Sequence, residues 1–376
     1  MAMKTKRAAL FAAAFLSVSG LVAVPSQARA AGRSFLSRFS TVSNGTSTVP
    51  ANGDVNPYGV AVVRRSVGSL IRGDILVSNF NNSSNQQGTG TTIMQITPEG
   101  DASVFAQLDS GQLKDVCPGG IGLTTALVEL RRGWVIVGSL PTTDGTSATA
   151  KAGCLLVLDS HGQVAETISG GLINGPWDMT AFEAGDWTAL FVTNVLNGTV
   201  AASPNTVNQG TVVRIVLSVP EDDDAQSAPP EVLSETVIGS GFAERTDPAA
   251  LVVGPTGVGL GHDGTLYVAD TVNSAVQALP NALFRHTSAG MGQTVSMGGA
   301  INGPLGLAIA PNGDIIVANA GDGNMVEITP DGQQIDVTLA DTTGTGGGTL
   351  FGLAVAPNHQ GVYFVNDGDN TLRFLH

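Results

Sequence analysis

Residues 303–332 read "GPLGLAIAPNGDIIVANAGDGNMVEITPDG". The stretch opens with Gly-Pro, continues as a short apolar run, turns at Asn-Gly-Asp, and adds two further β-rich runs before Pro-Asp-Gly. Nearly the same arrangement occurs at residues 254–279, "GPTGVGLGHDGTLYVADTVNSAVQAL". Short apolar runs separated by Gly, Asn and Asp turns are typical of antiparallel strands. The chain therefore repeats a small β-sheet unit.

Six such units follow one another along the chain. Each begins with a Pro-x-Gly entrance or a degenerate form of it, and a turn and a second β-rich run come next. The six entrances are "NPYGVAVV" (56–63), "CPGGIGLTTALV" (117–128), "GPWDMTAF" (175–182), "GPTGVGLG" (254–261), "GPLGLAIA" (303–310) and "TLFGLAVA" (349–356). Almost no helical periodicity competes with them. Small twisted sheets that repeat in this way bury their faces by stacking around a ring, so we predict an all-β, six-bladed β-propeller.

The two ends of the chain indicate how the ring closes. The last unit reaches His376 directly after its third β-rich run, so it lacks a fourth strand. Residues 34–42, "SFLSRFSTV", are strand-like and have no other evident partner. We therefore expect residues 34–42 to form the fourth strand of the last blade.

The first thirty residues carry the pattern of a secretory signal peptide. Lys4, Lys6 and Arg7 precede an apolar stretch, and a small-x-small sequence ends at Ala30, as in exported proteins. We expect residues 1–30 to be removed and residues 31–376 to form one propeller domain, either periplasmic or secreted. A membrane anchor is the alternative for the N-terminus, whereas no later stretch is apolar for long enough to cross a bilayer.

The charge of the mature chain argues against nucleic acid as a partner. Loss of residues 1–30 leaves 13 of the 17 basic residues against 31 acidic ones, a net charge of −18. A charge of this sign and size repels nucleic acid and anionic membranes and favours solubility.

The chain has two cysteines, Cys117 and Cys154. In an oxidising compartment we expect them to form a disulfide, and two buried free thiols are the alternative. A zinc site is not expected, because zinc takes four ligands and no histidine has suitable spacing.

The residue inside each entrance should approach the mouth of the channel. These residues are Tyr58, Gly119, Trp177, Thr256, Leu305 and Phe351. Asp178 takes the place of the entrance glycine in the third unit. We predict a ligand-binding mouth formed by Tyr58, Trp177 and Phe351, with Asp178 orienting a flat or sugar-like molecule. Packing of the three rings between blades is the alternative interpretation.

Two further sets of residues lie near the same face. The loops at 80–91, 139–153 and 195–210 are long and rich in Asn, Ser, Thr, Gln and Gly, which suits recognition of a partner but equally a tolerated insertion. The second β-rich run of each unit closes on a polar residue, and we expect these residues to cap turns rather than to bind a ligand. They are Asn79, Ser139, Asn194, Asp270, Asn319 and Asp367.

The segments "LYVADTVNSAV" (266–276) and "VNDGDNTLRFL" (365–375) resemble the NHL-repeat family of six-bladed propellers. The family supports the fold over nearly the whole mature chain, but its members bind, hydrolyse or eliminate, so it does not define a function. The chain is also distantly similar to gluconolactonase-like propellers, whose entrances present Asn and Asp to a divalent metal. Here aromatic or apolar residues stand at the entrances, so we expect no metal and no cofactor.

Two functional hypotheses follow. The first is an exported binding module that takes an unknown small molecule or protein at the face with the long loops. The second is a metal-dependent lactonase, hydrolase or lyase on the same scaffold, which would use acids such as Asp178, Asp270 or Asp367.

Overall fold

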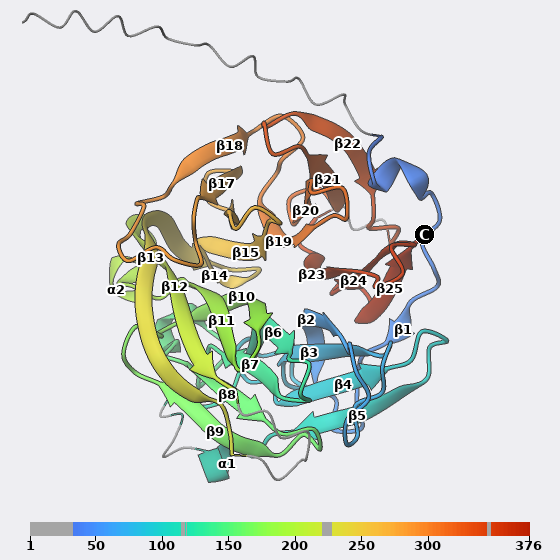
Figure 1. The fold of residues 1–376 in the computed structure, drawn as a ribbon. Coiled ribbons are helices and arrows are strands. Elements are labelled where there is room, and N and C mark those ends of the chain that lie inside the picture. The colour runs from blue at the N-terminus through green and yellow to red at the C-terminus, as the bar shows by residue number, and fades with distance from the viewer. Residues whose placement is uncertain (1–32, 114–116, 118, 220–227, 344–346) are drawn as a thin grey trace, which may run out of the picture. The chain divides into compact units, whose positions relative to one another are not determined.

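Each repeat predicted from the sequence folds as an antiparallel sheet, and the six sheets form a ring in chain order (Figure 1). The computed structural model describes residues 33–113, 117, 119–219, 228–343 and 347–376. The predicted signal peptide, residues 1–30, lies outside these residues. Among the described residues, no helix has the length and apolarity needed to cross a membrane.

The first three blades run from Val55 to Val253. Blade 1 consists of β2 (Val55–Val62), β3 (Ile75–Asn81), β4 (Thr92–Ile96) and β5 (Ala102–Gln107). Blade 2 consists of β6 (Leu123–Glu129), β7 (Val135–Ser139), β8 (Cys154–Leu158) and β9 (Val164–Ser169). Blade 3 consists of β10 (Pro176–Ala184), β11 (Trp187–Asn194), β12 (Val207–Ser218), β13 (Glu231–Asp247) and β14 (Leu251–Val253).

The last three blades complete the ring. Blade 4 consists of β15 (Pro255–Leu260), β16 (Leu266–Asp270), β17 (Ala275–Leu279) and β18 (Gln293–Met297). Blade 5 consists of β19 (Pro304–Ile309), β20 (Ile315–Asn319), β21 (Asn324–Ile328) and β22 (Gln334–Leu339). Blade 6 consists of β23 (Leu350–Val355), β24 (Val362–Asn366), β25 (Thr371–Leu375) and β1 (Thr46–Ser47).

Helical structure is confined to single turns in the described residues. These are two 3₁₀ turns, η1 (Leu36–Arg38) and η2 (Ser147–Thr149), and two short helices, α1 (Ser110–Leu113) and α2 (Thr199–Ala202). The first strand of each blade is the innermost, and neighbouring innermost strands contact one another around the whole ring, with β23 meeting β2. The predicted all-β, six-bladed propeller is thus confirmed.

An N-terminal strand closes the ring, but it lies further along the chain than predicted. Thr46 and Ser47 pair with Leu372 and Thr371 of β25, and Val42 forms an isolated bridge to Leu375. Most of residues 34–42 form no strand. Phe35 and Leu36 instead enter the core between blades 5 and 6 through the turn η1, because that core accepts two apolar side chains that an edge strand would leave exposed.

The predicted disulfide is present. Cys117 and Cys154 are bonded at a sequence separation of 37, and both are buried. The bond ties the start of β8 to the segment that leads into β6. In the chain-entropy model a loop of this length contributes about 4 kcal/mol of stability.

Candidate functional site in the central channel

The six innermost strands share one irregularity close to their N-terminal ends. In five blades the innermost strand has one extra residue relative to the second strand, as between Pro176 and Met179 in blade 3. In blade 2 it has two extra residues, between Leu123 and Leu127. Bulges of this kind redirect side chains and often lie next to sites. Here they determine which residues face the channel.

Glycine occupies the bulge in four blades, at Gly59, Gly257, Gly306 and Gly352. The neighbouring innermost strand leaves no space for a side chain there, since a Cβ at Gly352 would lie 2.2 Å from the Tyr58 carbonyl oxygen. Blade 3 has Asp178 at this level, and the longer bulge of blade 2 contains Thr125. Two adjacent blades thus have polar side chains at the level where the other four blades have glycine.

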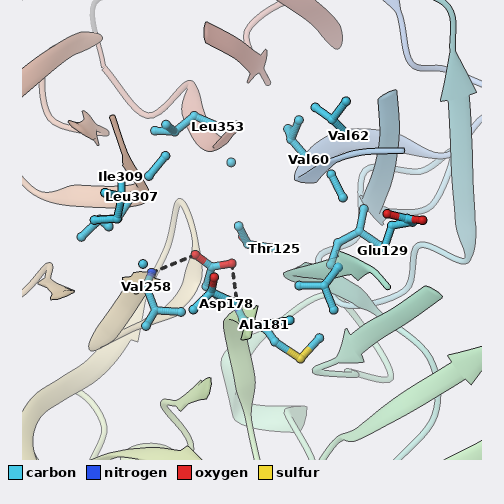
Figure 2. A pocket seen from close by; sticks show the side chains of 18 of the residues that line it. Val60, Val62, Thr125, Glu129, Asp178, Ala181, Val258, Leu307, Ile309 and Leu353 are labelled. Atoms are coloured by element: carbon cyan, nitrogen blue, oxygen red, sulfur yellow. Dashed lines mark hydrogen bonds between the residues drawn. The ribbon is translucent and has the colours of Figure 1, made fainter. Parts of the chain in front are cut away.

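A cavity of about 280 Å³ lies in the channel at this level (Figure 2). Most of its lining residues have apolar side chains, among them Val60, Met179, Val258, Leu307 and Leu353, but polar atoms account for more of its exposed surface than apolar atoms do. In blades 3 to 6 the innermost strands are buried at their N-terminal ends and become partly exposed toward their C-terminal ends. The cavity therefore opens at the C-terminal ends of these strands.

Asp178 is the acidic group at the depth of this cavity and is only 7% exposed. Its Oδ1 accepts a hydrogen bond from the Met179 amide at 2.8 Å, and its Oδ2 accepts one from the Val258 amide at 3.1 Å (Figure 2). Burial raises the pKa of Asp178 to about 8, although both amide bonds act in the opposite direction. The carboxyl group is therefore mostly protonated at pH 7.

Thr125 lines the same cavity and is 4% exposed. Its hydroxyl has no hydrogen-bond partner among the described residues. Buried hydroxyls are normally paired, and an unpaired one costs free energy. The site therefore contains an unused donor and acceptor beside a neutral carboxylic acid.

Charged groups stand at the open end of the cavity, on the side formed by blades 1 to 3. Arg64 contacts Glu129 Oε2 through its Nε at 3.2 Å and Glu183 Oε1 at 2.7 Å. Burial raises the pKa of Glu129 to about 7, while Arg64 acts to lower it. The opposite side of this opening is apolar, with Leu260 and Ile309.

The three aromatic residues predicted as a ligand-binding mouth lie at the other end of the channel. Tyr58, Trp177 and Phe351 are 2%, 3% and 1% exposed. The Tyr58 and Phe351 rings stack with centroids 4.0 Å apart, and Trp177 lies 6.0 Å from Tyr58. The structure therefore packs the rings between blades and exposes none of them, which was the alternative interpretation.

Residues 248–253, here called the strap, cover this aromatic cluster. Ala250, Leu251 and Val252 belong to the same buried cluster, and Trp177 Nε1 donates to the Val252 carbonyl at 3.1 Å. The strap follows β13 directly and contains β14, an extra strand that the repeat pattern does not predict. Rings and strap together close the channel at the N-terminal ends of the innermost strands.

The entrance of blade 2 differs from the prediction. Its innermost strand begins at Leu123. The Thr124 carbonyl accepts a hydrogen bond from the Ser78 hydroxyl of the preceding blade. In blade 4 the carbonyl of the entrance residue Thr256 accepts the equivalent bond from Thr193 of blade 3. Thr124, not Gly119, is thus the entrance residue. Two threonines inside an apolar run were the sequence signal for this position.

Most of the polar residues at the ends of the second strands cap turns, as expected, whereas Asn79 Nδ2 donates to the Thr48 carbonyl. Asn194 Oδ1 accepts from the amides of Asn174 and Gly175, and Asn319 Oδ1 accepts from Asn302. In blade 6 the equivalent residue is Asn366, not Asp367, because Asn366 pairs with Leu350 and its Oδ1 accepts from Gly368. These side chains fix the connections between blades.

The long loop of blade 1 contacts both the long loop of blade 2 and the strap. Thr142 N donates to the Gly88 carbonyl at 2.9 Å, and Gln87 Nε2 donates to the Pro248 carbonyl at 2.8 Å. A groove of about 300 Å³ runs between them, lined by Gln87, Thr146, Asp247 and Leu251 among others. The predicted partner surface thus contains a groove with both polar and apolar lining residues.

The chain matches no protein-family model, and no curated protein matches it. Solved structures share its fold. Regucalcin from Agrobacterium tumefaciens, described as a calcium-binding protein, has a TM-score of 0.54 at 13% identity, over 88% of this chain and 93% of the other. A gluconolactonase from Xanthomonas campestris has 0.50 at 14%, over 86% of each chain. A streptogramin B lyase has 0.50 at 12%, over 89% and 97%.

Likeness at these identities establishes the fold alone. The neighbours include gluconolactonase- and regucalcin-like six-bladed propellers, whereas the NHL label is not confirmed. The channel does not offer the ligand set that a hard divalent cation takes, six to eight oxygen atoms for calcium. Of its two carboxyl groups, Asp178 already accepts two amides and Glu129 is paired with Arg64, and Thr125 and Thr180 add only hydroxyls. The described residues contain no group of three His, Cys, Asp or Glu able to hold a metal.

Proposed function

We propose that this protein is an exported propeller that binds a small molecule in its central channel. One observation carries the proposal: Asp178 and the unpaired Thr125 hydroxyl, from adjacent blades, lie at the same level of a cavity whose lining side chains are mainly apolar. Apolar pockets with a few convergent polar groups are the usual form of small-molecule sites. A volume of about 280 Å³ suits a compact ligand.

Of the four residues predicted to bind a ligand, Asp178 lines the cavity directly. We propose that Asp178 contacts the ligand. Tyr58, Trp177 and Phe351 do not contact the ligand in this proposal. They support the site by closing the end of the channel beyond Asp178. Protein binding at the long-loop face stays a separate proposal, supported by the groove beneath the strap.

Screening of a library of uncharged compounds of about ten heavy atoms by saturation-transfer NMR tests the proposal. We expect several compounds to bind the wild-type protein and to lose binding in Thr125→Phe, which fills the cavity. Val104→Phe is the matched control, because Val104 is exposed on β5. Unchanged melting temperatures show that both variants are folded. Binding that survives Thr125→Phe would place the site elsewhere and contradict the proposal.

An acid–base enzyme in the same channel is the second candidate. The observation that favours it is the pKa of about 8 at Asp178, since a carboxylic acid that is neutral at pH 7 can donate a proton to a reacting group. The neighbours that are described as a gluconolactonase and a streptogramin B lyase use this fold for catalysis, so lactone hydrolysis is the first activity to assay.

The assay is acid release from glucono-δ-lactone, with and without chelator. A rate above background that survives the chelator and falls at least tenfold in Asp178→Asn would establish catalysis at this site. Asp270→Asn is the control, because Asp270 is also a buried acid with a raised pKa but does not line the cavity. Absence of any rate above background would remove this candidate and leave binding as the function.

Export remains part of the proposal. The buried disulfide between Cys117 and Cys154 and the N-terminal sequence pattern support it. Expression of the full chain in a bacterium, followed by N-terminal sequencing of the periplasmic or secreted product, should give a chain that begins at Ala31.

A further inference from the structure

We infer that the central channel recognises an uncharged carbonyl compound, whose oxygen accepts hydrogen bonds from the Asp178 carboxyl group and the Thr125 hydroxyl. The inference rests on the proposed function and specifies its ligand. It depends on the placement of two unused donors at one level of a cavity whose lining side chains are mainly apolar.

The first donor is the proton of Asp178. Each carboxyl oxygen accepts one backbone amide, from Met179 and from Val258. A carboxyl group this deeply buried and without a cation beside it holds its proton, and a protonated carboxyl has one O–H to donate. Among the described residues no acceptor is bonded to it, so the donor is available to a ligand.

The second donor is the Thr125 hydroxyl, which is 4% exposed and unpartnered among the described residues. The extra residue in the β6 bulge brings it to the level of Asp178 in the next blade. Figure 2 shows both side chains directed into the same space. A carbonyl oxygen has two lone pairs and can accept both bonds.

Charged ligands fit the cavity less well. The titratable residues of its lining, besides Asp178, are Arg64 and Glu129 at the opening, and Arg64 is already paired with Glu129 and Glu183. An anion would be buried with no free cation beside it, in a chain of net charge −14. An ammonium would need several acceptors, and the walls formed by blades 4 to 6 offer apolar side chains such as Leu307 and Leu353.

Four compounds with one ring system test the inference: 2-indanone, indane, 2-aminoindane and indane-2-carboxylate. Their dissociation constants are measured by NMR titration at pH 6.5. We expect 2-indanone to bind at least tenfold more tightly than each of the other three. A tenfold difference matches the gain expected from one to two buried hydrogen bonds.

Two isosteric variants identify the donors. Thr125→Val removes the hydroxyl and keeps the shape, so it should weaken 2-indanone roughly three- to tenfold and leave indane unchanged. The wild-type protein should lose affinity for 2-indanone as the pH rises above about 8, where Asp178 gives up its proton. In Asp178→Asn this pH dependence should disappear, whereas Asp270→Asn should retain it.

The possible outcomes separate the two proposals. If none of the four compounds binds, the small-molecule site fails and the inference falls with it. If they bind but 2-aminoindane or indane-2-carboxylate equals 2-indanone, the site stands and the carbonyl preference is wrong. If 2-indanone is preferred but its dissociation constant changes neither with pH nor in Thr125→Val, the assignment of the two donors is wrong.

Discussion

At the scale of single residues, Glu327 on β21 has a defined structural task. It is fully buried, and its two carboxylate oxygens accept bonds from Ser34 Oγ, the Phe35 and Leu36 amides and Asn312 Nδ2, at 2.6 to 3.0 Å. Burial opposes the charged form, but these bonds outweigh it and lower the pKa of Glu327. The residue therefore holds the N-terminal segment against blade 5 as a carboxylate.

Replacing Glu327 by Gln should destabilise the protein by about 3 kcal/mol. All four partners are donors, so either orientation of the amide group places its NH₂ against donors and leaves buried donors unsatisfied. Urea unfolding measures the loss. Glu99→Gln is the control, because Glu99 is exposed and makes no hydrogen bond that the structure records. Equal stability of the two variants would show that Glu327 does not anchor the segment.

At the scale of elements, the N-terminal segment, residues 34–47, holds the first and last parts of the ring together. Phe35 and Leu36 fill the core between blades 5 and 6, and β1 covers the edge of β25. The amides of Ser40 and Thr41 donate to the His376 carbonyl, and the His376 amide donates to Thr41. The two ends of the described chain are thus joined by core packing and by backbone bonds.

Deletion of residues 1–47 should therefore lower the free energy of unfolding by about 5 kcal/mol or more. Two buried apolar side chains contribute roughly 1.5–3 kcal/mol each, and the backbone bonds are lost as well. The uncovered edge of β25 should also promote self-association, visible by size-exclusion chromatography. Deletion of residues 1–33 is the control and should change neither property. If the longer deletion is as stable as the control, the segment does not close the ring.

Some elements of the fold could be predicted from the sequence and others could not. The repeated entrances, turns and strands predicted the six blades, because each unit has the same local chemistry. The disulfide followed from two cysteines and an export pattern. The strap could not be predicted, since residues 248–253 resemble any apolar connection and become buried only against rings from other blades.

The candidate site was predicted in part for a similar reason. Asp178 stood out as the residue in place of an entrance glycine, and it lines the cavity. Thr125 did not, because its position depends on one extra residue in a bulge that has no counterpart in the other units. The aromatic residues were located at the correct entrances, but whether an entrance is open depends on the strap.

At the scale of the whole molecule, buried acids set the response to pH. Burial raises the pKa values of Asp178 to about 8, of Glu129 and Glu244 to about 7, and of Asp367 to about 6. Their unfolded values lie near 4, so the folded protein binds more protons than the unfolded chain between about pH 4 and pH 8. Stability falls with rising pH wherever the folded state holds the excess of protons.

The protein should accordingly melt several degrees higher at pH 5 than at pH 8.5, with no further decline due to these carboxyls above about pH 8. The net charge of −14 adds to the effect, because repulsion among the acids grows as they ionise. Glu327 changes stability in the opposite direction, because its lowered pKa stabilises the fold at higher pH. This contribution is lost only below about pH 4.5, where the carboxylate begins to take up a proton. Melting curves from pH 5 to pH 9 test this, and Asp178→Asn should flatten the decline between pH 7 and pH 8 because that titration is gone. A melting temperature that rises with pH across this range would mean that the buried acids are ionised in the fold, and the neutral Asp178 on which the channel site depends would have to be abandoned.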